Sequence, residues 1–182
     1  QGLAYIDGFD HPDIIAGQGT AGIEIVAQVP NLDAVIVPVG GAGLLAGVSL
    51  AVKTLRPEAK VIAVEADHVA SFSAALKAGK PVRITTSPTL ADGLAIAQVG
   101  GNAFAIARQH TDKTVIVTAE ESALSILRIV ELEKAVVQAA PAPPPAARPP
   151  GPREDPKGQP AAPLPPRGTI DTSVPTPVTQ PP

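Results

Sequence analysis

The feature that most constrains the fold of this chain is an apolar run that stops abruptly in glycine. Val35-Ile36-Val37-Pro38-Val39 is followed by Gly40-Gly41-Ala42-Gly43, and a helix-prone stretch begins at Leu44. This order predicts a strand, a glycine-rich turn and the N-terminus of a helix. Backbone N–H groups converge in such a turn and the helix dipole adds partial positive charge, so the turn is suited to a phosphate. We therefore expect a phosphorylated cofactor here.

Residues 1–138 alternate between strand and helix patterns. The patterns predict strands over residues 33–39, 60–65 and 113–117, and helices over residues 20–29, 44–55, 69–77 and 118–137, the last with a capping box in Thr118-Ala119-Glu120-Glu121. Strands that alternate with helices indicate an α/β fold, with a parallel sheet covered by helices on both faces. The run 35–39 is apolar throughout, as in a strand buried on both sides. Ligands of such sheets bind at the carboxyl ends of the strands, where residues 40–43 and Glu65 fall.

Composition argues against several classes of function. The chain has no cysteine, hence no disulfide, thiolate nucleophile or zinc–thiolate site, and its net charge of −3 gives no indication of a nucleic-acid partner. His11, His68 and His110 are too far apart for a typical metal motif. No apolar run is long enough for a membrane span and no signal peptide is recognisable, so we expect a cytoplasmic or organelle-matrix protein. The absence of methionine predicts a fragment, a processed product or an incomplete gene model.

A second region, residues 139–182, is set apart by proline. Most of the 22 prolines lie there, without a periodic apolar face and without an aromatic residue. This composition predicts a disordered tail, partly polyproline II. Pro163-Leu164-Pro165-Pro166 beside Arg167 resembles a ligand for an aromatic-lined groove, which would make the chain a non-catalytic interaction protein. An unselected linker or a misread coding sequence is the preferred interpretation, and a frameshift, retained intron or splice variant would explain the abrupt change after Val137.

The glycine turn alone is compatible with two other interpretations. Gly41-x-Gly43-x-x-x-Gly47 is a relaxed dinucleotide fingerprint, and Glu65 ends the next predicted strand, where an acid that binds the ribose of NAD is expected. An NAD-binding Rossmann domain is therefore one alternative. A tight strand-to-helix turn that holds no ligand is the other.

The segments that flank the turn favour a different family. The chain resembles the fold-type II pyridoxal-phosphate enzymes, and most closely the threonine/serine dehydratases (ammonia-lyases) and serine racemase. The resemblance is carried by Ile14-Ile15-Ala16-Gly17-Gln18-Gly19-Thr20, Glu24, the glycine turn, Val64-Glu65, Thr89-Leu90-Ala91-Asp92-Gly93-Leu94, Ser125-Ile126-Leu127-Arg128 and Glu133-Lys134-Ala135-Val136-Val137. It implies pyridoxal 5'-phosphate as cofactor, a small amino-acid substrate, β-elimination of water from L-threonine or L-serine to a 2-keto acid and ammonia, and a homodimer by analogy.

The resemblance also implies a cofactor site and a cation site. Gly40, Gly41, Ala42, Gly43 and Leu44 would grip the phosphate through backbone N–H groups. The family usually has glycine at all four loop positions, so Ala42 is expected to have a negative φ.

For the cation, the resemblance implies three ligands, which are Glu65, the carbonyl of Val69 and the side-chain oxygen of Ser71. Because the last of these is a serine, as in family members that hold a monovalent cation, a monovalent ion is expected. An Asp at this position would suit a divalent ion better. Oxygen ligands suit such hard cations. The alternative for Glu65 is a solvated carboxylate at the end of a strand.

Several other residues are assigned structural roles or none. The family's Schiff-base lysine lies in a Ser-x-Lys context that this sequence lacks, so no catalytic residue is assigned and the chain is predicted to be inactive alone. Gln18-Gly19-Thr20 is expected to cap a helix, His68 and His110 to lie at the surface or in ordinary packing, and Asp92 to form a turn. Gly100-Gly101-Asn102 precedes a helix and receives no role. Whether the parent is a dehydratase or a racemase stays open.

Overall fold

Helices and strands alternate through residues 4–134, the part of the chain that the computed structural model describes. The elements in order are α1 (Pro12–Gln28), β1 (Ala34–Pro38), α2 (Gly43–Leu55), β2 (Lys60–Ala66), the 3-10 turn η1 (Asp67–Val69), α3 (Ser71–Ala78), the 3-10 turn η2 (Asp92–Leu94), α4 (Gly101–His110), β3 (Lys113–Val117) and α5 (Ala119–Glu133). The three predicted strands are confirmed to within a residue or two at their ends.

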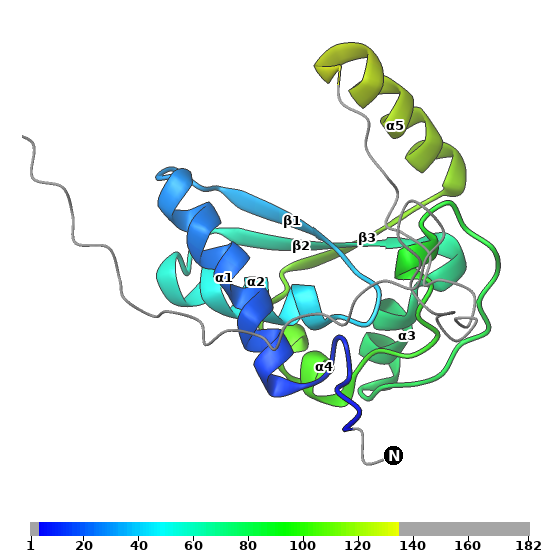
Figure 1. Ribbon diagram of the computed structural model, residues 1–182, viewed down its shortest axis with the longest axis horizontal. Coiled ribbons are helices and arrows are strands. Elements are labelled where there is room, and N and C mark those ends of the chain that lie inside the picture. The colour runs from blue at the N-terminus through cyan, green and yellow to red at the C-terminus, as the bar shows by residue number, and fades with distance from the viewer. Residues whose placement is uncertain (1–3, 135–182) are drawn as a thin grey trace, which may run out of the picture. The chain divides into compact units, whose positions relative to one another are not determined.

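The strands form one parallel sheet in the order β1-β2-β3 (Figure 1). Val37 pairs with Ala63, and Val64 pairs with Val115. All three strands therefore end at the same edge of the sheet, and the loop after β1 lies beside the end of β2. The predicted α/β class with a parallel sheet is confirmed.

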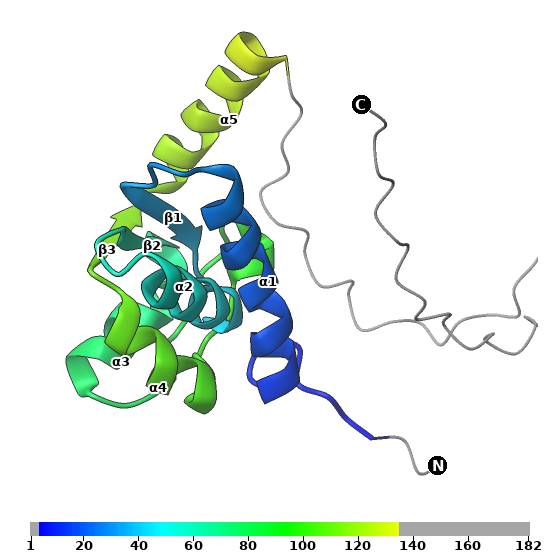
Figure 2. The same cartoon turned by 90° about the vertical axis from the view of Figure 1, so that its left-hand side faces the viewer.

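The core lies between the sheet and the helices that cover one of its faces. Helix α2 packs against β1 and β2, and α1 and α4 pack against α2 (Figure 2). Gly22 permits close approach of α1 and α2, because a Cβ there would lie 2.9 Å from the Cβ of Ala51. The buried apolar residues that share this core include Val35, Val37, Leu45, Val61, Phe72 and Phe104.

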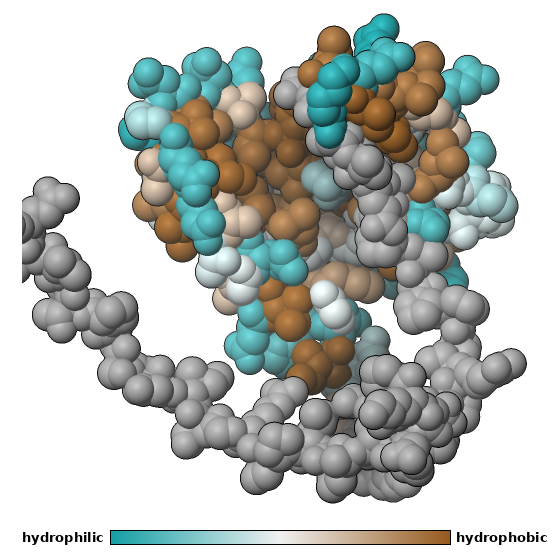
Figure 3. Space-filling model, turned by 45° about the horizontal axis from the view of Figure 1, so that its top comes forward, coloured by the Kyte–Doolittle hydropathy of each residue, from teal (hydrophilic) through white to brown (hydrophobic). Residues whose placement is uncertain are grey.

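The opposite face of the sheet is open over the described residues. Burial alternates along β1, and Ile36 is 67% exposed. Ile62 and Val64 of β2, which pair with Ile36 and Pro38 and so share their face, are only half-buried. The expectation that residues 35–39 are buried on both sides is therefore wrong for this part of the chain, in which the described helices pack on the face that carries Val35 and Val37. Figure 3 shows apolar side chains gathered on this side of the molecule. The apolar run predicted the strand, whereas coverage of its second face depends on other segments of polypeptide.

Helix α1 begins eight residues earlier than predicted. His11 is its N-cap and accepts a hydrogen bond at Nδ1 from the N–H of Asp13 (3.3 Å), and Pro12 occupies the first turn. Proline and an acidic residue are favourable at this end of a helix. Gln18-Gly19-Thr20 lies within the helix, so its predicted capping role is wrong. Gly19 lies instead against Gly47 of α2.

Helix α5 begins as predicted. The N–H of Glu121 donates to Oγ1 of Thr118 (3.1 Å), and the N–H of Thr118 donates to Oε2 of Glu121 (2.8 Å), which completes the capping box. The predicted continuation of this helix to residue 137 lies outside the described residues. The same holds for the proline-rich tail and for the predicted domain boundary near residue 138. None of the described helices has the length and apolar character that crossing a membrane requires.

Candidate functional site

The loop between β1 and α2 carries a row of backbone N–H groups without partners. The N–H of Val39 still donates to the carbonyl of Val64 (2.9 Å) and so prolongs the sheet. Beyond it, nothing within residues 4–134 accepts a hydrogen bond from the N–H groups of residues 40–44. The first turn of α2 has no acidic side chain, and its N-cap has no side-chain cap. The partial positive charge of this helix end is therefore left for an external anion.

The loop glycines are required by close packing on the inner side of the loop. A Cβ at Gly41 would collide with the ring of Phe9, and one at Gly43 would collide with the carbonyl of Phe9. A Cβ at Gly40 would lie 3.1 Å from the Cα of Leu94. The protein itself thus explains these three glycines. The open N–H groups, rather than the glycines, indicate a ligand.

Ala42 adopts the left-handed conformation, with φ of 70° and ψ of 4°, and is buried. The expectation of a negative φ is therefore wrong. A left-handed conformation costs an L-residue other than glycine about 1–2 kcal/mol. Such strain persists only where the surroundings impose it, and it is concentrated at functional loops. Here Ala42 lies between β1 and the first residue of α2, Gly43.

Glu65 is fully buried at the end of β2. Its Oε1 accepts the N–H of Phe72 (2.7 Å), and its Oε2 accepts the N–H of Ser73 (2.9 Å) and also the hydroxyl of Ser73. The alternative of a solvated carboxylate is therefore wrong. Glu65 acts as a tertiary cap for the N-terminus of α3, a partner that the sequence does not reveal.

The other predicted cation ligands lie close to Glu65 in the chain and are also buried. Ser71 is the first residue of α3, and its Oγ is buried without a hydrogen-bond partner among the described residues. Val69 ends η1 and is buried as well. No cluster of three or more His, Cys, Asp or Glu side chains that could hold a metal occurs in the described part of the chain. A site here would therefore rest on one carboxylate supplemented by neutral oxygens.

The remaining singled-out residues have structural roles. Asp92 begins η2 and accepts the N–H of Gly93 (2.8 Å), as predicted for a turn. Nδ1 of His68 lies 2.6 Å from the carbonyl oxygen of Pro88 at the surface. His110 lies in the last turn of α4. Gly19 lies against Gly47, since a Cβ on Gly19 would be 3.3 Å from the Gly47 carbonyl oxygen.

Three residues near the loop received no role in the sequence reasoning. Phe9 packs beneath the glycines, Asp10 accepts the N–H groups of Gly101 and Ala103 (2.9 and 2.8 Å), and Gly100 donates its N–H to the carbonyl of Gly41 (3.1 Å). Asp10 and Gly100 are separated by about ninety positions in the chain. No local pattern connects them, so no sequence signal could have identified this contact.

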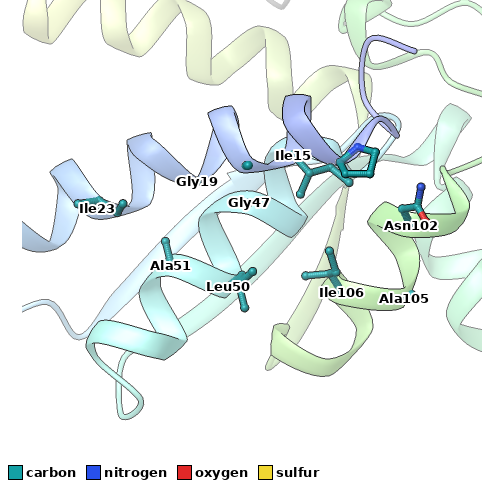
Figure 4. A pocket seen from close by; sticks show the side chains of 11 residues that line it. Ile15, Gly19, Ile23, Gly47, Leu50, Ala51, Asn102, Ala105 and Ile106 are labelled. Carbon is teal, nitrogen blue, oxygen red and sulfur yellow. The ribbon is translucent and has the colours of Figure 1, made fainter. Parts of the chain in front are cut away.

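A groove of about 440 Å³ lies between α1, α2 and α4 (Figure 4). Ile15, Ile23, Leu50 and Ile106 contribute to its apolar lining, and no ionisable side chain is part of that lining. None of residues 40–44 lines it. Its chemistry does not suit an anion, so we place the candidate site at the glycine loop.

Comparison with known families identifies the family of this chain. The sequence matches the family described as pyridoxal-phosphate dependent enzyme over residues 1–147. The chain belongs to the pyridoxal-phosphate dependent enzyme family. The resemblance inferred from the motifs is thereby confirmed, and the NAD-binding interpretation loses its support.

Individual members of this family share the fold and a substantial part of the sequence. L-threonine ammonia-lyase of Thermotoga maritima is 42% identical over 76% of this chain and 35% of its own length. The processed form of threonine deaminase isoform 2 from Solanum lycopersicum has a TM-score of 0.73 and 38% identity, over 76% of this chain and 40% of that chain. Serine racemase from Dictyostelium discoideum has a TM-score of 0.68 and 37% identity, over 74% of this chain and 42% of that chain. The chain thus spans well under half the length of these relatives.

The described residues fit the phosphate of the family's cofactor. The open N–H groups of residues 40–44 lie at the N-terminus of α2, where no acidic side chain competes for them. Backbone N–H groups at a helix N-terminus are a common phosphate site. The methyl group of Ala42 is buried, and its N–H has no acceptor among the described residues. Gly40, Gly41, Ala42, Gly43 and Leu44 stay the predicted cofactor-binding residues of this pyridoxal-phosphate enzyme chain.

Proposed function

We propose that this chain supplies the phosphate-binding part of the cofactor site of a pyridoxal-phosphate-dependent L-threonine/L-serine ammonia-lyase. The proposal is carried by the N–H groups of residues 40–44, which have no acceptor within residues 4–134, in a chain that belongs to the family. The relatives named threonine ammonia-lyase and threonine deaminase support the substrate and the reaction. A homodimer and a cytoplasmic location belong to the same proposal.

In this proposal the chain binds and orients the cofactor. When bound, the cofactor stabilises negative charge at the α-carbon of an amino acid, so that a β-hydroxyl can leave. The loop N–H groups hold the phosphate at the end of β1, and Phe9 beneath the loop keeps water from its inner side. None of the lysines lies in the Ser-x-Lys context of the family's Schiff-base lysine. Nζ of Lys53 lies 2.8 Å from Oδ2 of Asp112 and donates a hydrogen bond to the carbonyl of Ala59 (2.9 Å). We therefore expect no lyase activity from the chain alone.

The test uses pyridoxine 5'-phosphate, which lacks the aldehyde and cannot react with surface lysines. The full chain is titrated with this compound and with pyridoxine while the 31P signal and the amide spectrum are followed. We expect saturable binding of the phosphorylated compound only. Binding of NAD without any response to pyridoxine 5'-phosphate would instead support a nucleotide-binding domain.

A proline substitution tests the role of one loop N–H group, and a second one at the matching position of another helix serves as its control. Leu44→Pro removes one open N–H in the first turn of α2, where no helical hydrogen bond is lost. We expect it to weaken the binding of pyridoxine 5'-phosphate several-fold. Glu120→Pro places proline at the corresponding position of α5 and leaves the affinity unchanged. Equal effects of the two substitutions, or none, would contradict a role for the loop N–H groups.

The racemase alternative is supported by the serine racemase structure that shares the fold. The two parents share every motif of this segment, so the chain itself does not discriminate between them. An assay of the enzyme reconstituted with the lysine-bearing part separates them, because a lyase yields keto acid and ammonia whereas a racemase yields the D-amino acid. Partner binding through Pro163-Leu164-Pro165-Pro166, outside the described residues, would support the interaction protein instead.

We also propose that Glu65, the carbonyl of Val69 and the hydroxyl of Ser71 hold a monovalent cation, with a divalent one as the alternative. Support comes from the buried, unpartnered Oγ of Ser71 beside a buried carboxylate. The melting temperature is compared in K⁺, Na⁺, Mg²⁺ and tetramethylammonium salts of equal ionic strength. We expect a cation-specific rise that Ser71→Ala removes and Ser49→Ala keeps, because the buried Ser49 hydroxyl already bonds the Ala46 carbonyl (3.2 Å). A melting temperature indifferent to the cation would contradict the site.

A further inference from the structure

Asp10 caps the N-terminus of α4 from a segment about ninety residues earlier in the chain. Its Oδ2 accepts the N–H of Gly101 (2.9 Å), and its Oδ1 accepts the N–H of Ala103 (2.8 Å). Asn102 returns a bond from Nδ2 to the Asp10 carbonyl (3.0 Å). Asp7 fixes the turn that presents Asp10, since its Oδ1 accepts the N–H of Asp10 (2.8 Å). A carboxylate at a helix N-terminus also interacts favourably with the helix dipole.

The helix start that Asp10 holds is in turn bonded to the glycine loop. A side chain on Gly100 would collide with the Asp10 carboxylate, so glycine is required for this approach. The N–H of Gly100 donates to the carbonyl of Gly41 (3.1 Å). Asp10, the start of α4 and the loop therefore form one continuous set of hydrogen bonds.

The bond to Gly41 determines the direction of the next N–H group. All described peptide bonds are trans. In a trans peptide the C=O and the following N–H point in opposite directions. Because the Gly41 carbonyl is directed at Gly100, the N–H of Ala42 must point away from α4, to the side where no described group accepts it. The left-handed φ of Ala42 then continues the chain into α2.

We propose that Asp10 is a positioning residue, which through Gly100 and Gly41 directs the N–H of Ala42 at the phosphate of the cofactor. This inference rests on the proposed function. Asp10 touches neither cofactor nor substrate and acts by tethering the loop. Gly100-Gly101-Asn102, to which the sequence analysis gave no role, connects Asp10 to the glycine loop in this proposal.

The test compares Asp10→Ala and Asp10→Asn with Asp13→Ala in the full chain. Asp13 is a matched control, because its side chain is 93% exposed in the first turn of α1 and pairs with no charged group other than His11 (3.8 Å) among residues 4–134. We expect Asp10→Ala to weaken the binding of pyridoxine 5'-phosphate roughly tenfold, the factor that a lost hydrogen bond of ordinary strength gives. Asp10→Asn keeps one acceptor oxygen and should fall between. Asp13→Ala should bind like the unchanged chain.

A second measurement separates positioning from mere stability and needs no ligand. Amide hydrogen exchange is followed at Gly100, whose N–H is bonded to the loop, and at Val39, whose N–H belongs to the sheet. In Asp10→Ala we expect Gly100 to lose protection while Val39 keeps it. A variant that is only less stable would lose protection at both.

The outcomes distinguish the two proposals. Binding by the unchanged chain that Asp10→Ala leaves intact, with Gly100 still protected, would overturn the positioning role alone. Failure of the unchanged chain to bind pyridoxine 5'-phosphate would overturn the proposed function, and the exchange at Gly100 would still decide whether Asp10 tethers the loop. If Asp10→Ala does not fold, Asp10→Asn and Asn102→Ala, which remove only part of the cap, take its place in both measurements.

Discussion

Replacement of Glu65 by glutamine should destabilise the fold out of proportion to the change in shape. The carboxylate is fully buried and accepts the N–H groups of Phe72 and Ser73 and the hydroxyl of Ser73. Glutamine keeps the size of the side chain and one acceptor oxygen. Its NH₂ group replaces the other oxygen and faces a donor, so one of the two backbone N–H groups, that of Phe72 or that of Ser73, loses its acceptor.

The expected magnitude follows from these contacts. Hydrogen bonds to a charged group contribute about 1.5–3 kcal/mol each, and a buried donor without an acceptor costs about 1–3 kcal/mol. Glu65→Gln weakens one N–H bond and removes another, so we expect a loss of about 2–3 kcal/mol in the free energy of unfolding. Glu65→Ala leaves both N–H groups without an acceptor and should cost about 4 kcal/mol.

The assay is urea unfolding followed by far-UV circular dichroism, because the chain has no tryptophan and one tyrosine. Glu58→Gln is the control, since Glu58 is exposed and surface substitutions of this kind stay within about 0.5 kcal/mol. A Glu65→Gln variant as stable as Glu58→Gln would refute the capping role. A loss that occurs only when K⁺ or Na⁺ is present would refute it as well, because Glu65 would then act through the cation.

Three further predictions concern the loop, the α2–β3 connection and α5. Ala42→Gly should raise the free energy of unfolding by about 0.5–1 kcal/mol, because relief of the left-handed strain exceeds the entropy cost of glycine; a loss of stability would contradict the positive φ. The hydrogen bond from Lys53 holds the pKa of Asp112 below its ordinary value, so its stabilisation is complete above about pH 4 and is lost as pH falls through the lower pKa of the folded state. Asp112→Asn should therefore flatten the decline of stability in acid titrations, and an unchanged acid limb would contradict this. Thr118→Ala should lower the local stability of α5 by about 1 kcal/mol, seen as faster exchange of the Glu121 N–H, and unchanged exchange would contradict the capping box.

Local patterns were sufficient for the elements whose signals are local. The β-branched runs between turn residues predicted the three strands, and the order strand, glycine turn, helix placed α2 correctly. The capping box placed the start of α5, because both of its hydrogen bonds lie within four consecutive residues. These contacts need no knowledge of the rest of the chain.

Other features failed because they depend on partners distant in sequence. Helix α1 was predicted too short, since Gly17 and Gly19 precede the predicted start at residue 20, whereas Gly19 lies within the helix and against Gly47 of α2. The alternative of a solvated Glu65 failed because its carboxylate accepts the N–H of Phe72 at the N-terminus of α3. The bond between Gly100 and Gly41 spans nearly sixty positions and has no local signature.

The glycine loop was predicted correctly in place, but the reasoning from its glycines alone was incomplete. Gly40, Gly41 and Gly43 face Leu94 and Phe9, so packing alone would select glycine there whether or not a ligand binds. The residue that takes the conformation typical of glycine is Ala42, the one loop residue with a side chain. What distinguishes a phosphate site from a tight turn is therefore the direction of the N–H groups. That direction is set from outside the loop, by the donor that holds the Gly41 carbonyl, and so a glycine motif predicts where an anion could bind but not whether the loop is turned toward it.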